Sequence, residues 1–393
     1  MQRASGQTEP RRALRIGLVA GEASGDQLGA ALIEQLRLHA LDAEFRGVVG
    51  PKMLAAGCAP LASAEELAVM GLTEVLAHLP RLWRLRRDLE RSFADWRPDV
   101  FIGIDSPEFN LGLAARLKAR GIRTVQYVSP QVWAWRQGRV RTIARDCDLV
   151  LCLLPFEPEF YREHAVRAVY VGHPLADQVP LDTDRAVARR ELGLDPAATV
   201  VALLPGSRLG EVRRLGPAFL ATASWLRGRR PALQFIAPMA SAAAAAGFAG
   251  AAAAGVRLLD GQARRALQAA DAALVTSGTA TLEALLCRCP MVVAYRTGNL
   301  TAALVRLLRL VRVPHFALPN LLAGESLVPE YFQDAANAEN LGRGLLRALD
   351  DTTYRAHLLR RFDAIHRDLR QGGAERAATA VLELARAAEA SAA

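Results

Sequence analysis

The amino-acid sequence predicts an α/β protein with two Rossmann-like domains, each built on a parallel β-sheet. The chain has 393 residues, and chains longer than about 250–300 residues usually divide into domains. Its hydrophobic fraction of 51% suits parallel sheets, whose strands are buried on both faces. Short β-like runs alternate with helical patterns in two series, and a polar, proline-containing stretch at 174–185 separates the two series.

The expected elements follow this order along the chain. The first series of strands is expected at 15–20, 44–49, 100–104, 123–128, 149–154 and 168–171. The second series is expected at 200–204, 234–237, 256–259, 272–276 and 291–294, with helices from 338 to the end. The predicted parts are a disordered tail (1–13), an N-terminal domain (14–178), a C-terminal domain (179–365) and a final helix and tail (366–393). Because open parallel sheets bind ligands at the carboxyl ends of their strands, the active site is expected in a cleft between the domains.

Charge and cysteine usage narrow the choice of partners and compartment. The formal net charge of +9 favours anionic partners such as phosphorylated substrates or an anionic membrane surface, although an arginine-rich composition bias explains it equally well. The five cysteines have no metal-binding or CxxC spacing, and the N-terminal pattern does not predict a signal peptide. We therefore expect a cytoplasmic protein with reduced thiols.

Three strand-to-helix junctions carry the small polar residues that suit phosphate binding. They lie at 21–26 (GEASGD), at 205–211 (PGSRLGE) and at 277–283 (SGTATLE). Glycine allows close backbone approach to a ligand, and the free N–H groups of a helix start attract anions. None of the three matches a Walker A loop or a dinucleotide-binding GxGxxG motif.

The third junction is the better candidate for a diphosphate. Its hydroxyl and N–H groups open a helix, and Glu283 follows about one turn later, within reach of a ribose hydroxyl. An ordinary N-cap by Ser277 or Thr279 is the simpler alternative, and taken alone it is favoured. At the second junction, Arg208 supplies a fixed cation that suits a departing diphosphate.

Two segments match the DxD metal signature, at 146–148 and at 182–184. The first opens an apolar strand and the second lies in the interdomain stretch, so both matches are interpreted as accidental. If Arg208 and a helix dipole neutralise the diphosphate, the reaction needs no metal.

Asp105 is the candidate general base. It follows the strand at 100–104, and a carboxylate at the carboxyl end of a parallel strand lies where active sites form. There it would accept a proton from an attacking sugar hydroxyl. The alternative is that it caps the next helix, which has Pro107 in its first turn. Glu22, Glu108 and His173 remain possible assistants.

Six segments resemble the signatures of the lipid-A-disaccharide synthase family. These are GEASGD at 21–26, IDSPEFN at 104–110, YVSPQVWAWR at 127–136, LLPGSR at 203–208 with Glu211 and Val212, SGTATLE at 277–283, and LPNLLAG at 318–324. The resemblance spans residues 14–384, and the run at 129–136 is highly specific. Gln131 stands where the family commonly has Ser, and Leu209-Gly210 where it commonly has Gly-Ala, which leaves only fine specificity in doubt.

The resemblance implies a GT-B fold and an inverting hexosyltransferase without a metal or other cofactor. The family condenses UDP-2,3-diacylglucosamine with 2,3-diacylglucosamine 1-phosphate to a β-1,6-linked disaccharide 1-phosphate and UDP. Asp105 and Arg208 match its essential aspartate and arginine. The resemblance also implies that the last helix either returns to the N-terminal domain or is exchanged in a homodimer.

The predicted site residues lie in these six segments. The donor-binding positions are Gly206, Ser207, Arg208, Glu211, Ser277, Gly278, Thr279, Ala280, Thr281 and Glu283. The acceptor and cleft positions are Glu22, Ser24, Gly25, Asp26, Asn110, Ser129, Trp133, Arg136 and Asn320.

Acylated substrates imply contact with the inner membrane, and the segment 65–91 is the first candidate for it. Its apolar residues predicted to face lipid are Val69, Met70, Leu72, Val75, Leu76, Leu79 and Trp83, beside arginines at 81, 84, 86 and 87. A second candidate is 300–313. The alternative for both is a core-facing amphipathic helix. We expect a peripheral protein that binds no nucleic acid.

Two other functions remain open on the same predicted fold. A UDP-N-acetylglucosamine 2-epimerase would act on a soluble sugar nucleotide and would need no lipid-facing segment. A non-catalytic nucleotide-sugar binder is disfavoured only weakly by the presence of both Asp105 and Arg208.

Overall fold

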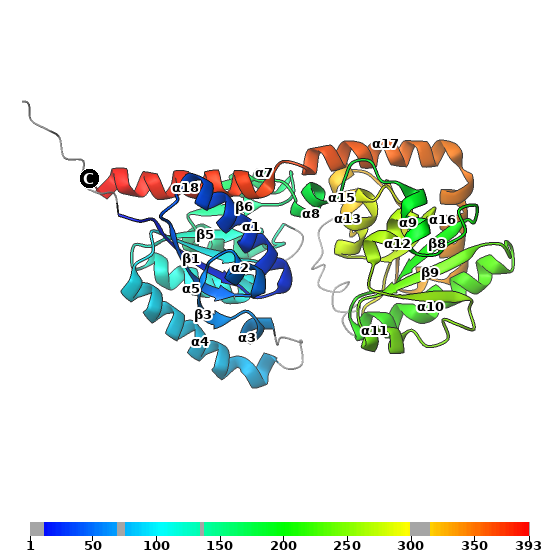
Figure 1. The fold of residues 1–393 in the computed structure, drawn as a ribbon, viewed down its shortest axis with the longest axis horizontal. Coiled ribbons are helices and arrows are strands. Elements are labelled where there is room, and N and C mark those ends of the chain that lie inside the picture. The colour runs from blue at the N-terminus through cyan, green and yellow to red at the C-terminus, as the bar shows by residue number, and fades with distance from the viewer. Residues whose placement is uncertain (1–11, 69–74, 134–136, 299–314, 393) are drawn as a thin grey trace, which may run out of the picture. The chain divides into compact units, whose positions relative to one another are not determined.

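The computed structural model describes residues 12–68, 75–133, 137–298 and 315–392, so most of the expected tail and the candidate segment at 300–313 lie outside it. The chain divides into two compact units, Met1–Pro174 with Gln371–Ala393, and Leu175–Arg370. Each unit contains one parallel sheet with helices on both faces (Figure 1). None of the helices in the described ranges is long and apolar enough to cross a bilayer.

The first unit contains a seven-stranded parallel sheet with the order β3-β2-β1-β4-β5-β6-β7. Its strands are β1 (Arg15–Ala20), β2 (Glu44–Val49), β3 (Ala59–Ser63), β4 (Val100–Ile104), β5 (Arg123–Tyr127), β6 (Leu149–Cys152) and β7 (Ala168–Tyr170). β1, β2 and β4 begin and end as predicted, whereas the edge strand β3 was not predicted from the sequence.

Helices cover both faces of this sheet and bury three apolar clusters, one of them around Ile143 and Tyr161. The helices are α1 (Ala23–His39), α2 (Pro51–Ala55), α3 (Glu65–Ala68), α4 (Val75–Trp96), α5 (Pro107–Lys118), α6 (Val140–Asp146), α7 (Glu157–Arg162) and α18 (Gly373–Ala392). On one face α1 packs against β1 and β4 and α18 packs against α1 and β5, and Leu18 and Val381 belong to the same buried cluster. On the other face α4 and α5 enclose Phe93 and Phe101. The C-terminal helix α18 is thus part of the first unit and lies along α1 (Figure 1).

The second unit contains a six-stranded parallel sheet with the order β10-β9-β8-β11-β12-β13. The strands are β8 (Val200–Leu204), β9 (Gln234–Met239), β10 (Val256–Asp260), β11 (Ala272–Thr276), β12 (Met291–Tyr295) and β13 (Glu330–Phe332). The helices are α8 (Pro174–Gln178), α9 (Arg185–Glu191), α10 (Leu209–Arg227), α11 (Ala242–Gly247), α12 (Ala263–Ala269), α13 (Thr279–Leu286), α15 (Leu318–Ala323), α16 (Ala338–Asp350) and α17 (Thr352–Leu369). The three-residue strand β13 was also not predicted.

Strand register decides which loops meet at the carboxyl edge of each sheet. In the first unit Ala20 pairs with Ile104, and Ile104 pairs with Tyr127, so the loops after β1, β4 and β5 emerge side by side. In the second unit the last pairs join β8 to β11 and β11 to β12, which makes the loops after these three strands neighbours. The candidates Asp105, Arg208 and Ser277 lie in these loops.

Candidate active site

Asp105 lies in a strained turn at the carboxyl end of β4. Its φ is 54° and that of Ser106 is 41°, so two consecutive non-glycine residues adopt the left-handed conformation. Such residues cost about 1–3 kcal/mol each and persist only where the surroundings fix them. The turn directs the chain from β4 into α5 within two residues.

Two buried amide side chains fix the backbone of Asp105. The Nδ2 of Asn110, which is fully buried, donates to the carbonyl oxygens of Asp105 at 2.8 Å and Ile104 at 3.3 Å. The Nε2 of Gln126 donates to the same Asp105 oxygen at 3.1 Å. Gly103 is required beside them, because a Cβ there would lie 2.6 Å from the Cβ of Asn110. Asn110 therefore acts on the backbone of the turn.

The Asp105 carboxyl group is suited to accept a proton. Burial raises its pKa above the ordinary value; the Ser106 backbone N–H opposes this effect, and the negative charge of Glu108 adds to it. Glu108 instead forms an ion pair with Arg139 at 2.7 Å. A pocket of about 260 Å³ opens beside Asp105 and is also bounded by Val128 and Glu108. Of the two carboxylates, Glu108 is paired, whereas within the described parts of the chain Asp105 forms no ion pair.

The loop at 129–133 forms the other wall of this pocket and rests on a buried polar network. The hydroxyl groups of Ser129 and Tyr161 are 2.9 Å apart, and the indole Nε1 of Trp133 donates to Glu157 at 3.1 Å. The backbone N–H of Leu154 donates to the other Glu157 oxygen at 3.0 Å. Burial raises the pKa of Glu157 to about 7, although these donors oppose the shift.

The sequence interpretation missed Glu157 and Tyr161. Both lie on the six-residue helix α7, whose first turn carries Glu157 and Glu159, and acidic residues at a helix start are ordinarily explained by the helix dipole. Ser129 and Trp133, predicted as acceptor residues, are 5% and 9% exposed and bond to this network, so they hold the loop. Arg136 lies outside the described residues.

The junction after β1 separates into exposed and structural residues. Glu22 and Ser24 are exposed at the start of α1, and Gly25 packs against Ala20 and Ile104. The Asp26 carboxylate is buried, and its oxygens accept from the backbone N–H groups of Gly50, Lys52 and Met53 at 2.9–3.0 Å. Asp26 thus caps α2, and the exposed residues of this junction are Glu22, Ala23 and Ser24.

The junction after β8 presents an arginine at a helix start. Arg208 and Ser207 are exposed, and Arg208 directly precedes α10. The Glu211 carboxylate accepts from the backbone N–H groups of Ser207 at 3.1 Å and Arg208 at 3.3 Å. Gly206 has a φ of 129°, and a Cβ there would lie 2.5 Å from that of Glu211. Glu211 therefore shapes the turn that carries Arg208.

The junction after β11 forms the start of α13. The Ser277 hydroxyl donates to the Phe316 carbonyl at 2.9 Å, and the Thr281 hydroxyl donates to the Gly278 carbonyl at 2.8 Å. Gly278 has a φ of 143°, and Thr279 is exposed at the first helical position, followed by the partly buried Ala280. Glu283 is partly buried; burial raises its pKa, and Arg264 opposes that effect. Exposed donors and a carboxylate thus lie one helical turn apart.

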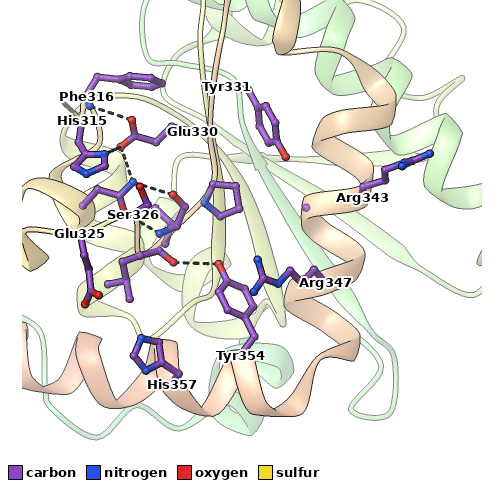
Figure 2. A pocket seen from close by; sticks show the side chains of 15 residues that line it. His315, Phe316, Glu325, Ser326, Glu330, Tyr331, Arg343, Arg347, Tyr354 and His357 are labelled. Carbon is purple, nitrogen blue, oxygen red and sulfur yellow. Dashed lines mark hydrogen bonds and ion pairs between the residues drawn. The ribbon is translucent and has the colours of Figure 1, made fainter.

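Asn320 holds a loop of the second unit and lines a pocket of about 870 Å³. Figure 2 shows this pocket, with Glu330 and Phe316 on one side of it. The Asn320 amide donates to Val328 O at 2.8 Å and to Glu330 at 2.7 Å, and its oxygen accepts from the Val328 N–H at 2.7 Å. Glu330 also accepts from the backbone N–H groups of Phe316 and Ala317. This network fixes the loop whose Phe316 carbonyl binds Ser277, and sequence reasoning did not single out Glu330.

The two DxD segments have structural partners. The Asp148 carboxylate accepts from the Thr124 N–H at 2.8 Å and pairs with Lys118 at 3.1 Å. Asp184 caps α9 through two backbone N–H groups. Within the described residues no three His, Cys, Asp or Glu side chains form a metal-binding group.

The candidate membrane segment contains both core and surface residues. Val69, Met70 and Leu72 lie outside the described residues, and Val75, Leu76 and Leu79 belong to α4. Leu82 is buried in the core, whereas Trp83 is 68% exposed. Arg84 and Arg87 are exposed near it, and Arg86 stacks on the Phe109 ring at 4.9 Å. One face of α4 is therefore core, and the face with Trp83 is free.

Comparison with known proteins adds independent findings. A family model described as lipid-A-disaccharide synthetase matches residues 16–383. The lipid-A-disaccharide synthase of Chromohalobacter salexigens is 52% identical over 380 residues, covering 94% of this chain and 96% of that protein.

Two solved structures resemble the chain in fold. The glycosyltransferase of kitacinnamycin superposes with a TM-score of 0.62 at 17% identity, covering 95% of this chain and 99% of that chain. The UDP-GlcNAc 2-epimerase from Neisseria meningitidis gives 0.61 at 12% identity, covering 94% and 99%. At these identities the likeness concerns the fold alone, and with the two parallel sheets it confirms the predicted GT-B architecture.

Proposed function

Since the chain belongs to the lipid-A-disaccharide synthase family and is a glycosyltransferase of lipid A biosynthesis, we propose that it joins UDP-2,3-diacylglucosamine to 2,3-diacylglucosamine 1-phosphate. The products are a β-1,6-linked disaccharide 1-phosphate and UDP. The observation that carries the chemistry is Asp105, a partly buried carboxyl with a raised pKa on a backbone fixed by Asn110 and Gln126.

The proposed reaction is a single displacement with inversion. The 6-hydroxyl oxygen of the acceptor attacks the anomeric carbon of the donor, the bond from that carbon to the diphosphate oxygen breaks, and the hydroxyl proton passes to Asp105. A general base is most effective when its pKa approaches the working pH, so the burial that raises the pKa of Asp105 favours this role. The strained turn would orient the carboxylate toward the hydroxyl.

The donor half of the proposal rests on the second unit. The exposed Arg208 and the start of α13 follow neighbouring strands, β8 and β11, which pair along their length. A guanidinium and the positive end of a helix both stabilise the negative charge that develops on a departing diphosphate. Thr279 would donate to a phosphate oxygen, and Glu283 would accept from a ribose hydroxyl. In this arrangement the protein supplies the charge that a divalent metal would otherwise provide.

The acyl chains of both substrates suggest work at a membrane surface. The exposed Trp83, with Arg84 and Arg87 nearby, has the amphipathic character of interfacial segments. Transfer of a whole acyl chain into water would cost about 0.8 kcal/mol per CH₂. We place the inner membrane at this surface of α4.

Product analysis tests the proposed function directly. Purified enzyme is incubated with the acylated acceptor and either acylated or non-acylated UDP-glucosamine. The products are then separated and identified by mass spectrometry. We expect equimolar UDP and disaccharide only with the acylated donor. Formation of a UDP-mannosamine derivative would indicate the epimerase class to which the Neisseria structure belongs by name. Binding without turnover would indicate a non-catalytic nucleotide-sugar binder.

A further inference from the structure

A second pocket of the first unit lies at the same sheet edge as Asp105. Its volume is about 540 Å³, within the range of about 300–1,000 Å³ typical of small-molecule sites. Four pieces of chain bound it: the end of β1 with the start of α1, the end of β2, helix α2, and β3 with the turn after it. All of these belong to the first unit.

The lining of this pocket is predominantly apolar. Nine of its thirteen lining residues carry no polar side-chain group, including Val49, Pro51, Leu54 and Ala62. Of the four polar ones, Asp26 is fully engaged in capping α2. The other three side chains are exposed, and two of them are carboxylates. A hydrocarbon fits this lining, whereas a phosphate would meet like charge at the mouth.

The pocket is linked to the turn of Asp105 by direct contact. Gly21 lines the pocket, and a Cβ on it would lie 2.5 Å from the Ser106 Oγ and 3.4 Å from the Leu67 Cβ. The preceding residue, Ala20, pairs with Ile104, the residue before Asp105. One end of the pocket therefore begins one residue away from the proposed base.

Leu54 forms an unusual part of the wall. It belongs to α2 and is 52% exposed, although it lines this apolar pocket. A chain lying in the pocket would cover this side chain and remove apolar surface from water.

We propose that this pocket holds one acyl chain of the acceptor sugar and so contributes to acyl-chain specificity. The inference rests on the proposed function, which supplies an acylated acceptor. The acceptor is preferred to the donor because the pocket adjoins Asp105, which must reach the acceptor hydroxyl. The proposed diphosphate residues belong to the second unit instead.

Steady-state kinetics with acceptors of different chain length test this assignment. The variant is Leu54→Gln, which keeps the size of the side chain but makes the wall polar. We expect KM for a long-chain acceptor to rise about 10-fold, at the lower end of the effect of lost apolar contact in a pocket. KM for a short-chain acceptor and kcat for both should stay within 2-fold of wild type. Leu38→Gln on α1, where the leucine is 69% exposed and outside the pocket, is the matched control and should change nothing.

A second variant narrows the entrance of the pocket. Ala23 is exposed at the start of α1 and lines the pocket, so Ala23→Trp should narrow the entrance without disturbing the core. The long-chain acceptor should again lose affinity while the short-chain acceptor does not. Thermal melts of all variants verify folding.

Three outcomes would overturn the proposal. Equal KM changes for long-chain and short-chain acceptors would show that the pocket does not hold the chain. Sensitivity to donor chain length alone would assign the pocket to the other substrate. An effect of Leu38→Gln equal to that of Leu54→Gln would indicate general surface hydrophobicity. Absence of disaccharide with the wild-type enzyme would instead refute the proposed function, so the two failures are distinguishable.

Discussion

Replacement of Glu157 by Gln tests whether the loop beside Asp105 rests on a buried carboxyl that titrates near neutral pH. Burial raises the pKa of this group from 4.5 to about 7. Between these values the folded protein holds the proton while the unfolded chain has released it. The free energy of unfolding should therefore fall as the pH rises through this interval.

The size of the effect follows from the same interval. At 1.36 kcal/mol per pH unit, the span from 4.5 to about 7 corresponds to at most about 3 kcal/mol lost by pH 8. Glu157→Gln should abolish this part of the pH dependence. The Gln amide remains neutral, and its oxygen still accepts from Trp133 or Leu154.

The assay must report on Glu157 directly. The chain contains two units that need not unfold together, so a global unfolding signal alone would mix their contributions. The NMR signal of the Trp133 indole N–H, which donates to Glu157, should titrate with a midpoint near 7 in the wild type. Urea unfolding of the wild type and Glu157→Gln between pH 5 and 8.5 supplies the free energies. Glu159→Gln, an exposed change on the same helix, is the control. A midpoint near 4.5, or parallel pH profiles for all three proteins, would refute the reasoning.

Three further predictions concern catalysis and the membrane. Asp105→Asn should lower kcat by about 10²–10⁴-fold while UDP affinity, measured by calorimetry, stays constant. Because burial raises the pKa of Asp105, the acidic limb of the wild-type pH profile of kcat should lie at a higher pH than an ordinary aspartate would give. Arg208→Ala should cost about 2–4 kcal/mol in kcat/KM, and the wild-type rate should persist in excess EDTA; a strict Mg²⁺ requirement would contradict the arrangement. Trp83→Ser should reduce co-sedimentation with anionic vesicles several-fold without lowering the melting temperature, because the side chain is 68% exposed; unchanged vesicle binding would exclude this contact.

Most of the fold could be predicted because parallel strands leave a strong signal. Strands such as 100–104 and 272–276 are buried along their whole length, and they begin and end where the apolar runs do. The two unpredicted strands lack that signal. β3 contains Pro60 and is mostly exposed, as an edge strand is, and β13 has only three partly buried residues. Both are defined by their pairing with a neighbour, which the local sequence does not encode.

The site residues also differ in whether the sequence alone could predict them. Asp105 and Arg208 could be singled out because each follows a buried strand, so chain order alone places it at the carboxyl edge of a sheet. Gln126 and Glu157 could not, since their roles depend on contacts with residues distant along the chain. The glutamine lies within β5, a strand that also contains Arg123 and Thr124, and a polar residue in a strand does not by itself indicate which group its side chain contacts.

The strained backbone of Asp105 and the raised pKa of its carboxyl group occur in the same turn. Asn110 and Gln126 hold the Asp105 carbonyl from the interior, and this fixes the left-handed turn. The same turn keeps the carboxyl partly out of water, and burial is the largest cause of its raised pKa. A side chain at Gly21 would collide with Ser106, so the wall of the proposed acyl pocket also bears on this turn. We therefore expect a change at Asn110, Gln126 or Gly21 to alter the conformation of this turn first, and through it the position of the proposed base.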